Sequence, residues 1–246
     1  MYGLKRNTSR LFSNNGKLFV MAMDLPQSGV VDGLEKPRQL VRSLENSKLD
    51  GIIMNIGLAN EMAEGGLLNK KLVLRSSSGG SMLASEFTNV NTNHVSPETA
   101  LAYGTDAVLM MCIVGGKDYL ALQKMAEDID AFHKLSIPVI AEVMCDDYEK
   151  TGTYDVQLNG ARIAAELGAD VVKGFFTEKF ENVVSCCPVP FIMAGGAVDK
   201  NILDVAKEAL KCGVKGFAFG RNIFQSQNPA ATIAKVAELF DSSEKG

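Results

Sequence analysis

One lysine of this chain stands inside a strongly apolar segment, where its charge is costly. Lys173 belongs to the run Ala-Asp-Val-Val-Lys-Gly-Phe-Phe at 169–176, a pattern typical of a buried strand. A buried ammonium group must be paired with an acid or lose its proton. The neutral amine is a nucleophile for carbonyl carbons and gives a Schiff base. The run therefore indicates an imine-forming lysine; the alternative is a lysine whose head group reaches water at the mouth of the fold.

Two later apolar runs end in glycine and favour a phosphate site. One ends in Gly195-Gly196 and the other in Gly220, which Arg221 follows directly. Glycine lets a backbone N–H approach an anion without a Cβ in the way, and arginine adds a charge-assisted donor. We expect 221–225 to form a short helix whose N-terminus faces the phosphate. The alternative is that these glycines only allow tight turns.

Two acidic residues are candidates for moving protons near the lysine. Asp24 ends the first apolar run. Its carboxylate has three alternative roles: ion-pair partner of Lys173, general acid or base, or cap of the following loop. Glu142 has apolar neighbours and the strand parity of Met144, so on an inward face we expect burial to raise its pKa and suit it to proton transfer. The alternative is that Glu142 only pairs with Lys173 or Arg75.

We expect no metal and no other cofactor. The chain has two histidines, and its five cysteines lack a Cys-x-x-Cys spacing, so a structural zinc site or a three-histidine zinc site cannot be assembled. The remaining metal hypothesis is Mg²⁺ held by Glu142, Asp146 and Asp147. Adjacent acids in a loop are more often simply solvated.

The elements that must position these residues form a repeated pattern. Eight apolar runs, most of them continuous, alternate with helical patterns, as expected for parallel strands covered on both faces. This predicts a (β/α)8 TIM barrel, with a doubly wound open sheet as the alternative. We expect one barrel domain over 1–246, with 1–16 as an N-terminal extension. The predicted strands are 18–24, 51–56, 72–75, 107–114, 138–144, 170–176, 190–194 and 216–219.

Composition limits the partners. The net charge is −4, and no long basic stretch points to nucleic acid or to an anionic membrane surface. The apolar runs are too short to span a bilayer, and the first residues lack the apolar core of a signal peptide. We therefore expect a cytoplasmic protein with a small-molecule substrate.

Several segments resemble one family, the archaeal-type class I fructose-bisphosphate aldolases, which also contains the phospho-hydroxypentanedione thiolase of autoinducer-2 breakdown. The resemblance implies a (β/α)8 barrel, a Schiff base on Lys173, an acidic partner at Asp24, and a homo-oligomer, possibly a ring of ten chains. It also implies that phosphate is held by Gly195, Gly196, Gly220 and Arg221. The segments that carry it are 23–24, 73–76, 80–81, 161–173, 187–196 and 219–226.

The chain departs from this family at two positions. The family follows its strand-one aspartate with histidine, whereas Leu25 follows Asp24 here, and the aldolases carry a proton-donating tyrosine where this chain has Met144. We therefore expect a Schiff-base aldolase-type lyase acting on a small phosphorylated keto compound, with proton transfer moved to Glu142. The alternatives are a coenzyme A-dependent thiolase on a phosphorylated diketone and a non-catalytic barrel that binds phosphorylated metabolites.

Overall fold

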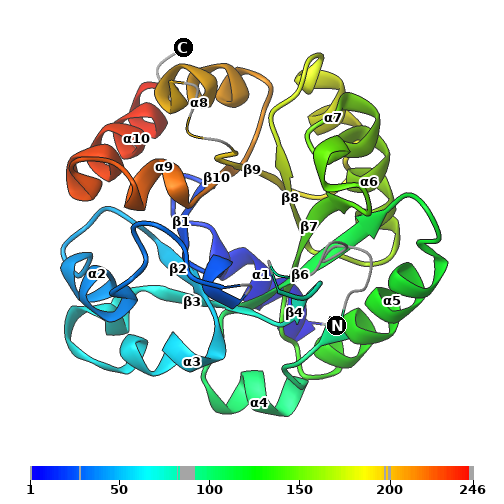
Figure 1. Ribbon diagram of the computed structural model, residues 1–246, viewed down its shortest axis with the longest axis horizontal. Coiled ribbons are helices and arrows are strands. Elements are labelled where there is room, and N and C mark those ends of the chain that lie inside the picture. The colour runs from blue at the N-terminus through cyan, green and yellow to red at the C-terminus, as the bar shows by residue number, and fades with distance from the viewer. Residues whose placement is uncertain are drawn as a thin grey trace.

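The computed structural model describes residues 2–27, 29–81, 83, 92–196, 198 and 201–243. Eight parallel strands close into a barrel in the order β1-β10-β9-β8-β7-β6-β3-β2, with an outer ring of helices around it (Figure 1). The predicted (β/α)8 barrel is confirmed, and closure of the sheet excludes the open-sheet alternative. The strands are β1 Leu18–Ala22, β2 Gly51–Met54, β3 Lys71–Arg75, β6 Ala107–Val114, β7 Val139–Cys145, β8 Val171–Phe175, β9 Phe191–Ala194 and β10 Gly216–Phe219.

The helices of the outer ring begin where the sequence places capping residues. The Ser96 side chain accepts a hydrogen bond from the Thr99 amide at 3.1 Å, and Asn228 caps the last helix in the same way. The α-helices are α2 Pro37–Ser43, α3 Ile56–Ala59, α4 Pro97–Ala102, α5 Tyr119–Lys134, α6 Tyr154–Glu166, α7 Phe180–Cys186, α8 Ile202–Lys211, α9 Arg221–Phe224 and α10 Pro229–Ser243. The 3-10 helices are η1 Leu25–Gln27, η2 Asn60–Ala63, η3 Gly65–Asn69 and η4 Tyr148–Lys150.

A small antiparallel pair was not predicted. It joins β4 Ser77–Ser78 to β5 Thr92–Asn93, just beyond the end of β3. Each strand has only two residues, which is too short for an alternating pattern to show in the sequence.

The first helix, α1 Tyr2–Leu11, lies across one end of the barrel rather than in the outer ring (Figure 1). Leu11 is 1% exposed and joins the cluster of side chains inside the barrel. The Asn7 amide donates to the carbonyl of Ser136 at 2.8 Å, shortly before β7. The helix therefore closes the end of the barrel at which the strands begin and leaves the opposite end open.

The barrel interior explains where the functional side chains stand. Alternate residues of each strand point inward, and they fill the interior with Val, Ile, Leu and Ala. One step of two residues beyond this apolar layer brings the next inward position to the open mouth. Five of these mouth residues follow Ala22, Val73, Leu109, Ile140 and Val171, and they are Asp24, Arg75, Met111, Glu142 and Lys173. In the part of the chain that the structure describes, no helix is both long and apolar enough to cross a membrane.

Candidate active site

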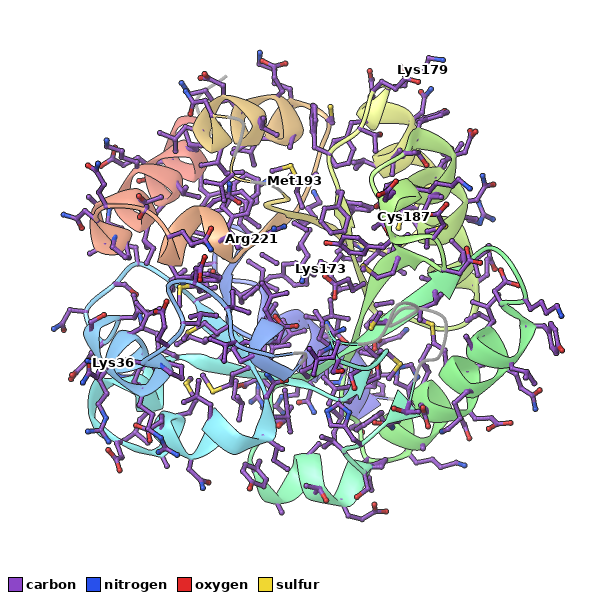
Figure 2. All side chains as sticks on the ribbon, viewed as in Figure 1. Lys36, Lys173, Lys179, Cys187, Met193 and Arg221 are labelled. Carbon is purple, nitrogen blue, oxygen red and sulfur yellow. The ribbon has the colours of Figure 1, made fainter. Side chains whose placement is uncertain are left out.

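A cavity of about 160 Å³ opens at the carboxyl ends of the barrel strands. All of the site residues that we predicted line it: Lys173, Asp24, Glu142, Gly195, Gly196, Gly220 and Arg221. Figure 2 shows Lys173 near the centre of the barrel, whereas Lys36 and Lys179 lie at its periphery. Ligand sites of this fold occur at this end of the barrel, so the cavity is the candidate active site.

Lys173 is buried and paired. Its Nζ lies 2.7 Å from Glu142 Oε1, because the two residues are register partners on the neighbouring strands β7 and β8. Both side chains face inward, which is the condition that we set for a role of Glu142, and Met144 also lines the cavity. A buried lysine must be paired with an acid or lose its proton, and the structure shows Lys173 paired with Glu142.

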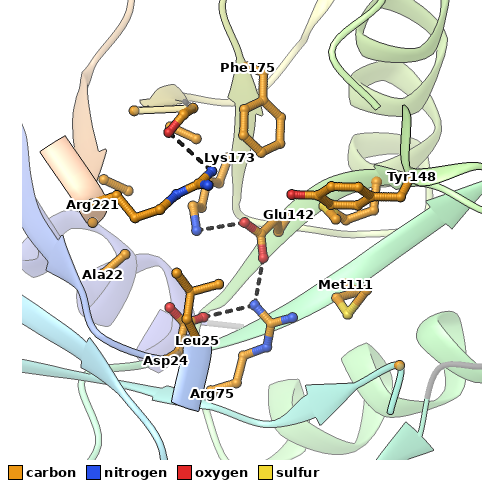
Figure 3. Close-up of a pocket in the computed structure, with 17 residues that line it drawn as sticks. Ala22, Asp24, Leu25, Arg75, Met111, Glu142, Tyr148, Lys173, Phe175 and Arg221 are labelled. Carbon is orange, nitrogen blue, oxygen red and sulfur yellow. Dashed lines mark hydrogen bonds and ion pairs between the residues drawn. The ribbon is translucent and has the colours of Figure 1, made fainter. Parts of the chain in front are cut away.

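Arg75 links Glu142 to Asp24. Its Nη1 donates to Asp24 Oδ2 at 2.9 Å and to Glu142 Oε2 at 2.5 Å, while its Nε donates to the carbonyl of Ser77 at 2.6 Å. Figure 3 shows the guanidinium between the two carboxylates, with Lys173 on the far side of Glu142. Two cations and two carboxylates therefore form one buried network whose charges balance.

The position of Asp24 differs from one of its predicted roles. The carboxylate pairs with Arg75, not with Lys173. Its carbonyl oxygen accepts a hydrogen bond from the Asn55 side chain at 2.8 Å, which fixes the chain just after β1. Arg75 was not among our predicted site residues, although its place at the end of β3 is the signal that marked the others.

The predicted pKa of Glu142 was wrong in direction. Burial by itself raises the pKa of this carboxyl, but the charges and hydrogen bonds of Lys173 and Arg75 together outweigh it and hold the pKa at about 2. Burial likewise disfavours the charged form of Arg75, yet Glu142 and Asp24 raise its pKa above the ordinary value. Glu142 is thus a carboxylate in the resting site and cannot donate a proton there.

The glycine ends meet at the other side of the cavity. α9 begins at Arg221 with Gly220 as its N-cap, so the predicted short helix is confirmed. A Cβ at Gly195 would collide with Asn222 Oδ1, and one at Gly220 would lie 2.9 Å from the carbonyl oxygen of Ala22. Arg221 Nη2 lies 3.3 Å from the carbonyl oxygen of Gly196. Packing against Asn222 and Ala22 therefore requires glycine at positions 195 and 220, and the Arg221 guanidinium on this side of the cavity can donate to an anion.

The remaining wall is mostly apolar. Met111 and Met144 form a cluster with Phe175 beside Lys173. Tyr148, in η4 after β7, also lines this side of the cavity. Sequence reasoning missed Tyr148 because it stands in a loop, where no periodicity indicates which way a side chain points.

The magnesium hypothesis finds no support. Across the described residues, no three or more His, Cys, Asp or Glu side chains come together as a metal site. The Glu142 carboxylate is held by Lys173 and Arg75, and the Asp147 carboxylate pairs with Lys150 at 2.9 Å.

Comparison with known proteins shows the family of the chain. Residues 14–226 match the model of the DeoC/LacD family aldolases. The chain belongs to this family. A relative from Archaeoglobus fulgidus, 2-amino-3,7-dideoxy-D-threo-hept-6-ulosonate synthase 1, is 30% identical over 98% of this chain and 91% of its own length. The 3-hydroxy-5-phosphonooxypentane-2,4-dione thiolase of Escherichia coli K12 is 29% identical over 99% of this chain and 84% of its own.

Solved structures of the same fold include two aldolases. A Schiff base-forming fructose-1,6-bisphosphate aldolase aligns with a TM-score of 0.86 and 25% identity, over 96% of this chain and 99% of its own. An archaeal fructose 1,6-bisphosphate aldolase aligns with a TM-score of 0.85 at 24% identity, over 97% and 99% of the two chains, and its likeness shows the fold alone. As a DeoC/LacD family member, the chain is a class I aldolase-type lyase, which disfavours the non-catalytic alternative.

Proposed function

We propose that Lys173 forms an imine with a small phosphorylated keto compound and that the chain cleaves or forms the neighbouring carbon–carbon bond. The observation that carries this proposal is the Lys173–Glu142 pair, 2.7 Å apart inside a cavity whose far side holds Arg221 and the glycine ends. A cavity of about 160 Å³ suits a compact substrate with one phosphate at that side.

The first step is proton transfer within the pair. When substrate displaces water from the cavity, the lower polarity favours the uncharged amine and acid over two ions. Glu142 Oε1 takes one proton from Lys173 Nζ, and the freed electron pair attacks the substrate carbonyl carbon. Glu142 returns this proton to the carbinolamine oxygen, and loss of that oxygen as water leaves an iminium ion. The iminium keeps the positive charge of the lysine, so the charges around Arg75 stay balanced.

The iminium then serves as an electron sink. The electrons of the adjacent carbon–carbon bond move into it and give an enamine, and synthesis runs the same step backwards. Asp24, which is paired with Arg75, lines the same cavity and stabilises positive charge near the reacting carbons. Contacts of the phosphate with Gly195, Gly220 and Arg221 hold the carbonyl at Lys173, so binding energy far from the bond positions it for reaction.

Borohydride trapping tests this proposal. The protein is reduced in the presence of dihydroxyacetone phosphate, fructose 1-phosphate or fructose 1,6-bisphosphate, and the adduct is located by peptide mass spectrometry. We expect one adduct on Lys173, lost in Lys173→Met. An adduct on another lysine, or no adduct with any of the three compounds, would overturn the assignment.

A second reaction is favoured by the Escherichia coli relative, whose name is that of a thiolase. In that case the bond would be cleaved by transfer of an acyl group to coenzyme A. Dependence of turnover on coenzyme A distinguishes the two reactions, since an aldolase needs no thiol. Independence from metals, a homo-oligomer and a cytoplasmic location stay predictions; light scattering in solution measures the oligomer.

A further inference from the structure

The proposed reaction does not assign the proton of the oxygen at the carbon–carbon bond, and the following inference rests on that proposed function. When the enamine carbon attacks an aldehyde, the aldehyde oxygen becomes an alkoxide and must gain a proton. When the bond is cleaved, the same oxygen must lose that proton. A group with an exchangeable proton is therefore required on the side of Lys173 that faces away from the phosphate.

The charged residues around Lys173 are committed to other contacts. Glu142 accepts hydrogen bonds from Lys173 and Arg75, and Asp24 accepts from the same guanidinium at 2.9 Å. Both carboxylates are thus engaged by cations at the stage when the carbon–carbon bond forms or breaks, since Glu142 has by then returned the proton it took from Lys173. Arg75 itself cannot give up a proton in proteins.

Tyr148 is the hydroxyl-bearing side chain of the described cavity lining. Its side chain belongs to η4, on the loop that follows β7, and the residue is 48% exposed. Figure 3 shows its hydroxyl directed into the cavity, between the Phe175 and Glu142 side chains in this view. The phenol thus faces the reacting region while the ring remains in contact with solvent.

The loop that carries Tyr148 is held at both sides. The amide of Cys145 donates to Thr151 Oγ1 at 3.0 Å, and the carbonyl of Thr151 accepts from the Gln157 side chain at 2.5 Å. The Lys150 amide donates to the carbonyl of Asp147 at 2.9 Å. These bonds tie the turn to the end of β7 and to α6, so the tyrosine is positioned by the fold rather than placed by chance on a loose segment.

We propose that Tyr148 is the proton donor and acceptor for the oxygen at the carbon–carbon bond. In synthesis the enamine carbon bonds to the aldehyde carbon, the C=O π electrons move to oxygen, and that oxygen takes the proton of Tyr148 Oη. The phenolate is reprotonated by water at the mouth. In cleavage the same steps run backwards: Tyr148 Oη accepts the substrate hydroxyl proton as its own proton passes to hydroxide at the mouth, and the bonding electrons pass to the iminium.

The surroundings of the phenol suit this role. Met111, Met144 and Phe175 supply an apolar wall that offers the substrate oxygen no strong donor. In a site of low polarity a single hydrogen bond to a developing alkoxide is stronger than in water. Tyr148 therefore provides this otherwise apolar wall with a hydrogen bond for an oxygen substituent next to the carbon–carbon bond.

The test separates imine formation from bond making. Wild type and Tyr148→Phe are compared by borohydride trapping of dihydroxyacetone phosphate and by the rate of product formation from dihydroxyacetone phosphate with acetaldehyde or glyceraldehyde. We expect Tyr148→Phe to trap like wild type and to form product about 10²–10⁴-fold more slowly, the usual contribution of a positioned acid or base. Tyr154→Phe is the matched control, because Tyr154 begins α6 and its hydroxyl contacts Asn182 at 3.4 Å, outside the cavity lining.

The outcomes distinguish the two proposals. Product formation by Tyr148→Phe at the wild-type rate overturns the role of Tyr148 and leaves the imine on Lys173 intact. Loss of trapping together with loss of product in Tyr148→Phe also overturns it, since the residue would then only support the site. A wild-type protein that neither traps the ketone nor forms product refutes the proposed function itself.

Discussion

Substitution of Glu142 tests two properties of the site at once: the stability that its carboxylate charge provides and its role in proton transfer. Glu142→Gln keeps the shape of the side chain and removes the carboxylate that pairs with Lys173 and Arg75. A carboxyl whose pKa is about 2 in the folded protein, against 4.5 ordinarily, stabilises the native state by about 3 kcal/mol at neutral pH. We expect the variant to lose about that free energy of unfolding.

The pH dependence has a definite sign. The folded pKa of Glu142 is lowered, so its stabilisation is full above about pH 5 and disappears as the pH falls from 4.5 toward 2. Urea unfolding of wild type and Glu142→Gln, followed by circular dichroism at pH 7, 4.5 and 3, measures the gap. A gap that stays constant down to pH 3 would show that the stabilisation does not come from the ionised carboxylate.

The same variant tests proton transfer. An amide cannot take the proton of Lys173, so we expect kcat and the rate of borohydride trapping to fall by roughly 10²–10⁴. Glu61→Gln is the matched control, since Glu61 is also a buried carboxylate with two arginine partners, Arg38 and Arg42, but lies outside the cavity. Wild-type turnover by Glu142→Gln, or an equal loss in Glu61→Gln, would contradict the reasoning.

The other predictions concern the phosphate side and metals. Arg221→Ala should raise KM for a phosphorylated ketone about 30-fold, the equivalent of about 2 kcal/mol for a charged hydrogen bond, with KM for an unphosphorylated analogue as the comparison. Gly195→Ala, whose Cβ would collide with Asn222, should raise the same KM, whereas Gly57→Ala meets no atom within 4 Å and should leave it unchanged. EDTA should leave the turnover rate as it is, and restoration of lost activity by Zn²⁺ or Mg²⁺ would contradict the imine mechanism.

The sequence allowed the barrel and most of the cavity lining to be predicted for one physical reason. Strands covered on both faces are continuously apolar, so a charged residue such as Lys173 near the end of a run stands out. The pKa of Glu142 could not be predicted in this way. It depends on Lys173 and on Arg75, and Arg75 is 67 residues away in sequence and reaches Glu142 from β3, two strands further around the barrel. Tyr148 was missed because the direction of a loop side chain is set by contacts such as that between Cys145 and Thr151, which leave no periodic signal.

Along a barrel strand, one inward residue packs in the apolar interior and contributes to stability, and the inward residue two positions later lies at the mouth and contributes to chemistry. On β8, for example, Val171 fills the interior and Lys173 reaches the cavity, about 7 Å further along the strand. A substitution at a mouth position such as Met111 or Met144 therefore changes what the substrate meets without opening a void in the layer below. The same scaffold can acquire a new substrate through mutations confined to one rim, and protein engineers can randomise that rim while keeping the interior fixed.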